Sequence, residues 1–203
     1  MHILKKNSKK PEVRKQELIE IASRLFAEKG YEAVAVRDIL EEVNGAPGMF
    51  YYYFKSKQDI YIAAMEQYIS ERLERKCKII EDDTISFDEK LPIFRSMITE
   101  DIRGYLERYN PKADASISDS SYKLWDLVQM ISRMVEPYSK FILQGISENK
   151  IKNNMGITEE NAGAYAMFVL YGAWGMIYNG RFTGSDKQYE VDDILEIINK
   201  LFY

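Results

Sequence analysis

Residues 36–57 read VRDILEEVNGAPGMFYYYFKSK, and their pattern predicts how the N-terminal part of the chain folds. Apolar residues recur at helical spacing over 36–43, which predicts a short helix with one buried face. Asn44-Gly45 then breaks the pattern, because both residues tolerate a positive φ. Pro47 suits the first position of a helix, so a second, very short helix is expected over 47–54. The stretch therefore predicts two short helices joined by a tight turn.

A longer amphipathic helix precedes this pair. Its pattern runs from about Val13 to Lys29, and Gly30 follows as a left-handed stop. Its buried face is formed by Leu18, Ile21, Ala22, Leu25 and Phe26. Three helices in succession, the last two joined by a tight turn, are a helix-turn-helix arrangement, in which the third helix enters the major groove of DNA.

Several short groups of residues in this region form a further pattern: Leu25-Phe26, Gly30-Tyr31, Val36-Arg37-Asp38-Ile39, Gly48, Phe50-Tyr51-Tyr52-Tyr53-Phe54 and Ser56-Lys57. This pattern resembles the N-terminal domain of the tetracycline-repressor (TetR) family. The resemblance covers roughly residues 14–65, about a quarter of the chain. It implies a transcriptional regulator, usually a repressor, that dimerises through its C-terminal helices and releases DNA when a small molecule enters its core.

The resemblance also implies which residues contact DNA. Arg37, at the start of the second helix, takes a position that can reach a base edge, and a bidentate pair with guanine is its natural use. Tyr51 and Lys57 fall on positions that hold phosphates. Tyr53 and Phe54 are expected in the small core, because the helical period turns them inward. The exposed, sequence-reading face of the third helix is formed by Ala46, Pro47, Met49 and Tyr52, with Gly48 in the same set.

Three features depart from the family pattern. The family commonly has hydroxyl residues just before the second helix, where this chain has Val34 and Ala35. A side-chain cap contributes roughly 1 kcal/mol, so this helix start is either less stable or capped otherwise. Asn44-Gly45 replaces the usual Gly-Val, and Pro47 replaces a frequent basic residue. Base readout is therefore expected to depend on Arg37, on phosphate contacts and on apolar contacts to thymine methyl groups.

The rest of the chain reads as helix, because 3.6-residue periods alternate with turn signals. The expected class is all-α, with an N-terminal helix-turn-helix domain, a larger C-terminal helical bundle and about nine helices in total. The further predicted helices are 56–80, 86–109 with an irregularity near Pro92, 121–135 and 137–150 hinged at Pro137, 158–178 and 191–202, with a loop over 110–119. The expected domains are a basic flexible arm (1–12), the helix-turn-helix domain (13–57) and a ligand-binding and dimerisation domain (58–203).

The composition excludes most catalytic chemistry. His2 is the only histidine and Cys77 the only cysteine, so triads and zinc sites built on these residues are not expected. No glycine falls into a dinucleotide-binding or phosphate-loop motif. Glu100 and Asp101 are adjacent in a helix and do not face each other. We therefore expect no enzyme, no cofactor and no metal.

The net charge of −4 hides an asymmetry, since residues 1–57 carry +3 and the remainder carries −7. The start of the chain is either a solvated tail or an arm that lies along phosphates and adds salt-sensitive affinity. Cys77 cannot form an intramolecular disulfide and no signal peptide is recognisable, so a cytoplasmic location is expected. The basic residues of the stretch from Met1 to Lys15 are Lys5, Lys6, Lys9, Lys10, Arg14 and Lys15.

Residues 161–180 contain no charged side chain. Their length allows a membrane span, but the asparagines at both ends and the lack of a second such segment favour a helix buried on nearly all sides. Small residues in this segment permit close helix packing. Together with the final helix over 191–202, it is the candidate for a two-fold, four-helix dimer interface, as the resemblance also implies.

The larger half is rich in methionine and aromatic residues. Such a set suits a cavity for flat or apolar ligands, although it also forms ordinary core. The resemblance favours a pocket, and the scarcity of charge favours a largely apolar or aromatic effector. The candidate pocket residues are Phe94, Met97, Tyr105, Trp125, Met130, Met134, Tyr138, Phe168, Tyr171 and Trp174.

The sequence thus predicts a homodimeric, ligand-responsive repressor that binds a palindromic operator in double-stranded DNA. An alternative of another class is a helical small-molecule-binding or scaffold protein whose helix-turn-helix has lost specific DNA binding. Pro47 and the missing hydroxyls would fit that alternative. Loss of DNA affinity on Arg37→Ala or Lys57→Ala separates the two.

Overall fold

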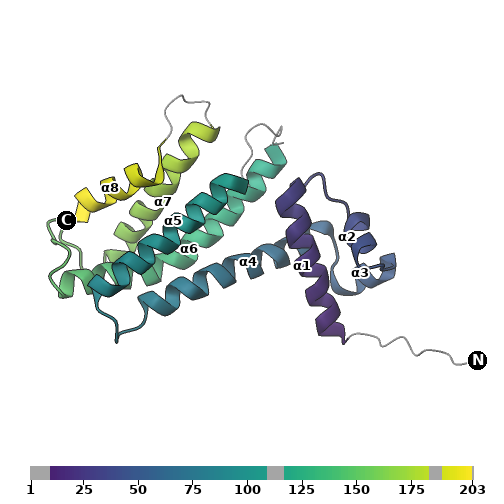
Figure 1. The fold of residues 1–203 in the computed structure, drawn as a ribbon, viewed down its shortest axis with the longest axis horizontal. Coiled ribbons are helices and arrows are strands. Elements are labelled where there is room, and N and C mark those ends of the chain that lie inside the picture. The colour runs from purple at the N-terminus through teal and green to yellow at the C-terminus, as the bar shows by residue number, and fades with distance from the viewer. Residues whose placement is uncertain (1–9, 109–116, 183–188, 203) are drawn as a thin grey trace, which may run out of the picture. The chain divides into compact units, whose positions relative to one another are not determined.

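A computed structural model describes residues 10–108, 117–182 and 189–202 (Figure 1). Every regular element within these ranges is an α-helix, which confirms the predicted all-α class. Most of the predicted basic arm lies outside the described residues. The helices are α1 (Pro11–Lys29), α2 (Val36–Glu42), α3 (Pro47–Tyr53), α4 (Lys57–Ile80), α5 (Phe87–Arg108), α6 (Ile117–Ser147), α7 (Ala162–Phe182) and α8 (Val191–Phe202).

The described residues form two compact units. The first contains the chain up to Tyr68 together with the beginning of α6 as far as Tyr122. The second contains the remainder of α4 and α6 with α5, α7 and α8. Helices α4 and α6 are therefore shared by both units.

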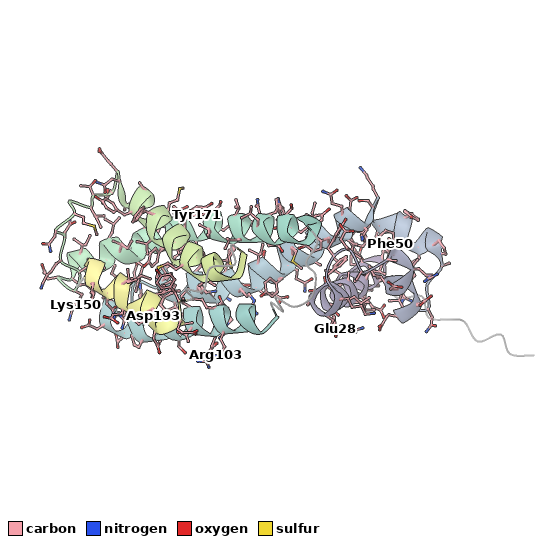
Figure 2. All side chains as sticks on the ribbon, turned by 90° about the horizontal axis from the view of Figure 1, so that it is seen from above. Glu28, Phe50, Arg103, Lys150, Tyr171 and Asp193 are labelled. Atoms are coloured by element: carbon pink, nitrogen blue, oxygen red, sulfur yellow. The ribbon has the colours of Figure 1, made fainter. Side chains whose placement is uncertain are left out.

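In the first unit α1, α2, α3 and the beginning of α4 enclose one apolar core (Figures 1 and 2). Burial of these side chains supplies the stability that such short helices cannot supply alone. Helix α1 ends at Gly30, whose φ is 84° and whose N–H donates to Phe26 O at 3.0 Å. The fully buried residues of this core are Leu18, Ala22, Val34, Ile39, Phe50 and Ile60.

The turn between α2 and α3 contains one residue in the left-handed backbone conformation and one backbone hydrogen bond back to α2. Asn44 has φ 49°, the conformation expected for it, and Gly45 N–H donates to Leu40 O at 2.9 Å. Gly45 also lies in a crowded place. A Cβ at this position would lie 2.2 Å from Met49 Cε, the flexible end of that side chain, and 3.0 Å from the Leu40 side chain. A larger residue at 45 would therefore require Met49 to move.

Asp38 supplies the cap that the residues before α2 lack. Ala35 is the N-cap residue and has no side-chain acceptor, but its N–H donates to Asp38 Oδ2 at 2.8 Å. This contact is one half of a capping box. A similar pair begins α4, where Ser56 Oγ accepts from Asp59 N–H at 3.1 Å and Lys55 N–H donates to Asp59 Oδ2 at 2.9 Å. The start of α2 is thus capped otherwise, by a carboxylate.

We expect Asp38→Ala to destabilise the protein by about 1 kcal/mol, because the Ala35 N–H loses its acceptor and the helix N-terminus loses a favourable negative charge. Urea unfolding followed by circular dichroism measures the change in the free energy of unfolding. Glu41→Ala is the matched control, since this carboxylate lies on α2 but caps nothing. An equal loss in both variants would contradict the capping role.

Helix α6 corrects one prediction. It runs without interruption from Ile117 to Ser147 with Pro137 inside it, so the two predicted helices hinged at Pro137 are wrong and the described helices number eight rather than nine. Proline removes one backbone hydrogen bond, but the buried face continues in register across it. Leu127, Ile131 and Met134 before the proline, and Tyr138, Phe141 and Ile142 after it, are all buried.

Two other boundaries differ from the predictions. Helix α7 begins at Ala162 instead of about 158, because Asn161 Oδ1 accepts from Thr158 N–H at 2.7 Å and closes a turn before the helix. Residues 117–119, predicted as loop, form the first turn of α6. Among the described helices none is sufficiently long and apolar to cross a membrane, and this includes α7.

Two buried lysines of the second unit have hydrogen-bond partners. Lys76 is 3% exposed and its ammonium donates to Asp101 Oδ2, while Arg72 Nη1 lies 2.5 Å from the other oxygen of Asp101. Lys90 is fully buried, and its ammonium donates to Ile80 O at 2.6 Å and to Gln144 Oε1 at 2.7 Å. Such groups are costly to bury unless their hydrogen bonds are made. Asp101 therefore fixes α5 against α4.

Candidate nucleic-acid interface and internal cavity

Arg37 projects from the first turn of α2 into solvent. Its side chain is 81% exposed, and its Nε lies 3.4 Å from Glu41 Oε1 one turn later. Such an exposed pair contributes little to stability. The guanidinium is therefore free to exchange Glu41 for an acceptor on a partner.

Helix α3 has one buried and one exposed face. Phe50 and Phe54 are 0% and 5% exposed, and Tyr53 packs against the same core. Tyr51 and Tyr52 are 62% and 72% exposed, so the structure shows the predicted division of the four residues from Tyr51 to Phe54. The remaining candidates on this side are Ala46, Pro47 and Gly48, which are exposed, and Met49, which is half-buried over Gly45.

Gly48 lies at the open side of α3. A Cβ at this position would meet no atom within 4 Å, so nothing inside the protein requires a glycine there. A glycine on an exposed helix costs stability relative to alanine, and one of its uses is to admit a partner's backbone closely. The open space at Gly48 is thus consistent with a close approach of another molecule.

Lys57 is held on an aromatic cluster at the beginning of α4. Its ammonium donates to Tyr31 O at 2.9 Å and lies 4.2 Å from the Tyr31 ring centroid. The centroid of the Tyr31 ring lies 3.9 Å from that of Tyr122 and 5.0 Å from that of Tyr61. Because an ammonium has three N–H donors, this contact leaves donors of Lys57 for a phosphate.

Burial, and then a hydrogen bond with Tyr122, raise the pKa of the Tyr31 hydroxyl well above its usual value, so this residue stays neutral. The hydroxyl cannot compete with a phosphate for the Lys57 charge. Burial also raises the pKa of the Cys77 thiol, followed by the charge of Glu81. Cys77 is therefore protonated at neutral pH and a poor nucleophile.

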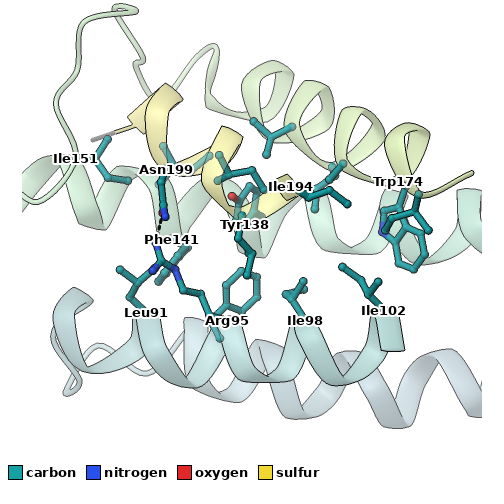
Figure 3. Close-up of a pocket in the computed structure, with 18 of the residues that line it drawn as sticks. Leu91, Arg95, Ile98, Ile102, Tyr138, Phe141, Ile151, Trp174, Ile194 and Asn199 are labelled. Atoms are coloured by element: carbon teal, nitrogen blue, oxygen red, sulfur yellow. Dashed lines mark hydrogen bonds between the residues drawn. The ribbon is translucent and has the colours of Figure 1, made fainter. Parts of the chain in front are cut away.

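The second unit contains a partly open cavity of about 90 Å³ between α5, α6, α7 and α8 (Figure 3). Its walls are mostly isoleucine, leucine and phenylalanine side chains. Three of the predicted pocket residues line it, namely Phe94, Tyr138 and Trp174. The Phe94 and Tyr138 rings stack with centroids 5.7 Å apart. The cavity can accept an apolar group of modest size.

The other candidate pocket residues are placed elsewhere. Phe168 and Tyr171 are 72% and 39% exposed on α7. The Tyr105 side chain lies outside the described residues. Four more do not line the cavity: Met97, Trp125, Met130 and Met134.

Two polar residues that line the cavity, Arg95 on α5 and Asn199 on α8, were not predicted from the sequence. Figure 3 shows the Arg95 side chain reaching toward Asn199, and Arg95 Nη2 donates to Asn199 Oδ1. A signal was present in the spacing. Leu91, Arg95, Ile98 and Ile102 recur at intervals of four, three and four residues, which is one face of a helix.

One face of α7 is apolar and uncovered in the single chain. Met167, Phe168 and Tyr171 are 47%, 72% and 39% exposed, and Figure 2 labels Tyr171 on this helix. Gly172 and Gly175 belong to the same helix, and a Cβ at either would meet no atom within 4 Å. The face therefore offers aromatic side chains beside small residues, a combination suited to close helix packing.

The first unit is a helix-turn-helix domain whose α3 has an exposed face, and comparison with known proteins agrees on the domain. Residues 18–64 match the family model of bacterial regulatory proteins, tetR family. The helix-turn-helix domain of this chain is therefore of the TetR type.

Two relatives illustrate how far the similarity extends. The uncharacterized HTH-type transcriptional regulator YerO of Bacillus subtilis (strain 168) is 39% identical over 70 residues, which are 34% of this chain and 24% of YerO. The chain thus matches about a quarter of that relative's length. The HTH-type transcriptional repressor DhaR of Mycobacterium sp. (strain GP1) is 22% identical over 148 residues, 70% of this chain and 71% of DhaR.

Solved structures share the fold. The regulatory protein TetR from Rhodobacter sphaeroides has a TM-score of 0.64 and 18% identity, with 94% of this chain and 100% of that chain covered. The transcriptional regulator FadR from Bacillus subtilis, solved in complex with stearoyl-CoA, has a TM-score of 0.59 and 19% identity, with 90% and 96% covered.

We expect Arg37→Ala to weaken binding to a preferred DNA site by a factor of about 5 to 150. The reason is that loss of a side-chain contact to a base edge costs roughly 1–3 kcal/mol of binding free energy. Lys57→Met should weaken binding to all sequences alike and lower the slope of log affinity against log salt by about one. Fluorescence anisotropy with labelled duplexes over a salt series measures both effects.

Arg75→Ala is the matched control for this experiment. Arg75 is an exposed arginine on α4 in the second unit, so its loss changes the net charge equally without altering the α2–α3 surface. Thermal unfolding of each variant separates lost contacts from lost folding. If Arg37→Ala binds DNA as the control does, Arg37 makes no base contact.

Proposed function

We propose that this protein is a transcriptional repressor that binds a palindromic DNA operator as a homodimer and releases it when a small molecule occupies the cavity of the second unit. The observation that carries the proposal is the exposed surface of α2 and α3. Arg37, Tyr51 and Tyr52 all face solvent there, although apolar burial fixes the helices that bear them. Relatives named as repressors support the same function.

DNA recognition would combine two kinds of contact. Arg37 would read a guanine, while apolar atoms of Ala46 and Met49 would contact thymine methyl groups. Tyr51 and Lys57 would hold phosphates, which position the domain without reading sequence. The lack of a basic side chain at Pro47 assigns most of the hydrogen-bonded readout to Arg37.

The homodimer is supported by the apolar face of α7. Leaving Phe168 and Tyr171 exposed is unfavourable in water, and a second copy of α7 and α8 would cover them in a two-fold, four-helix interface. A dimer would also place two α3 helices in successive turns of the major groove. Half-sites one turn apart are about 34–36 Å between centres, so a small change of spacing would prevent both from docking.

The ligand response is supported by the connectivity of α6. This helix carries Tyr122 in the first unit, against Tyr31 and Tyr61, and Tyr138 and Phe141 in the wall of the cavity. A ligand that alters the position of α6 would therefore act on the aromatic cluster that holds Lys57. Coupling of this kind is reciprocal, so operator DNA would weaken ligand binding by the same factor.

Selection of bound duplexes from a random pool by the purified protein tests the proposed function. We expect a palindromic sequence that binds about a thousandfold or more tightly than scrambled DNA at the same salt concentration. Binding that only follows salt, with no enriched sequence, would reject a specific regulator. It would favour the alternative of a small-molecule-binding or scaffold protein.

For the dimer, we expect Phe168→Glu to raise the dimer dissociation constant roughly a hundredfold or more, because the change places a charge in an apolar interface. Analytical ultracentrifugation measures it. Leu124→Glu is the matched control, since Leu124 is also an exposed apolar residue, 59% exposed, but lies on α6. Dissociation of both variants, or of neither, would contradict an interface on α7.

A further inference from the structure

Arg95 is an unusual member of the cavity wall. Among the described residues that line the cavity it alone carries a charge, and nearly all the others are hydrocarbon side chains. The side chain extends from α5 toward α8 in Figure 3, and Trp174 lies at the other end of the same cavity. The cavity therefore has one cationic end and one aromatic end.

The partner of Arg95 is neutral. Its guanidinium donates to Asn199 Oδ1, and no ion pair with a described carboxylate accompanies this contact. Arg72 offers a contrast within the same unit, because it is also partly buried but lies 2.5 Å from Asp101 Oδ1. A charge beside an apolar wall is costly unless an opposite charge balances it. Arg95 is half-buried, and none of the described carboxylates supplies that balancing charge.

The geometry of the two side chains suits an acid. A guanidinium has five N–H donors in a planar fork, and the bond to Asn199 occupies one of them. Two parallel bonds from such a fork match the two oxygens of a carboxylate. The Asn199 amide nitrogen can donate to the same group. A single cation balances a single negative charge, so a phosphate monoester with its second charge would stay partly unpaired.

We propose that the cavity binds a monocarboxylate with a short apolar body, whose acid group pairs with Arg95. The cavity of about 90 Å³ is smaller than the roughly 150 Å³ that admits benzene, so the body has on the order of four carbon atoms. This inference deepens the proposed function by naming the chemical class of the effector, and its role as an effector rests on that proposal. The apolar body contacts the isoleucine and aromatic walls.

Binding of the acid replaces a contact between helices. The bond from Arg95 to Asn199 joins α5 to α8. A carboxylate that takes the Arg95 donors competes with Asn199 Oδ1 for them. Occupation of the cavity therefore changes how α8 is held, and α8 belongs to the proposed dimer interface.

The test is a binding experiment without DNA. Trp174 lines the cavity and Trp125 does not, so the full chain with Trp125→Phe reports on the cavity through the emission of its remaining tryptophan. The probes are acetate, isovalerate, hexanoate and octanoate, each with its neutral amide. We expect isovalerate to bind about tenfold or more tightly than isovaleramide, because a charge-assisted pair exceeds a neutral hydrogen bond.

Two variants identify the anion receptor. Arg95→Met should reduce the affinity for isovalerate to that for isovaleramide, and leave the affinity for the amide unchanged. Asn199→Asp should also abolish the preference for the acid, because the new carboxylate pairs with Arg95 inside a folded protein. The second variant keeps the test decisive if the first does not fold, which thermal unfolding shows.

Equal binding of acid and amide, a preference for the acid that survives both variants, or no binding of any probe would overturn the proposal. Affinity that rises continuously to octanoate would overturn the size assigned to the ligand. These failures are distinct from failure of the proposed function. If the protein selects an operator but binds no carboxylate, the proposed function stands and the ligand class is wrong. If it binds carboxylates but selects no operator, the ligand class stands and the proposed function is wrong.

Discussion

The burial of Phe50 and Phe54 is the interaction on which the proposed reading surface depends. Helix α3 has seven residues, and a helix of that length is not stable alone in water. Its position is fixed because the two rings lie in the core formed with α1, α2 and α4. Burial of one such side chain contributes roughly 1.5–3 kcal/mol. The exposed Tyr51 and Tyr52 are therefore held at defined positions by their buried neighbours.

The first unit could be predicted closely because its signals are local. Asn44, Gly45 and Pro47 mark a turn and a helix start by their own backbone preferences, and the structure places both there. What the sequence could not reveal is the crowding around Gly45. A Cβ there would meet the end of the Met49 side chain from the following helix, whereas the φ of Gly45 is not positive. The cap of α2 by Asp38 was likewise hidden, since only the missing hydroxyl at Ala35 was evident.

The sequence-based predictions for the second unit are wrong where packing between helices outweighs the local preference of a residue. Pro137 is a helix breaker by itself, yet α6 continues because the residues on both sides of it bury the same face. The cavity shows the same limit. Residue type alone predicted which side chains line it. The wall depends instead on the register between four helices, and this register leaves Phe168 exposed and places Trp174 in the cavity wall. Arg95 was missed because a charged residue was not expected on an apolar face.

Helix α7 connects the two parts of the second unit that the proposed function requires. Its Val169 and Trp174 line the cavity, while Phe168 and Tyr171, close to them in sequence, lie on the opposite, exposed side. A rigid helix cannot move one face without the other. A ligand that displaces the cavity side of α7 must therefore displace the proposed dimer face as well. By linkage, the ligand and the second copy of the chain then alter each other's affinity by the same factor. This proposed double use would also account for the uncharged stretch of 161–180, because a charge on either side would be buried without a partner.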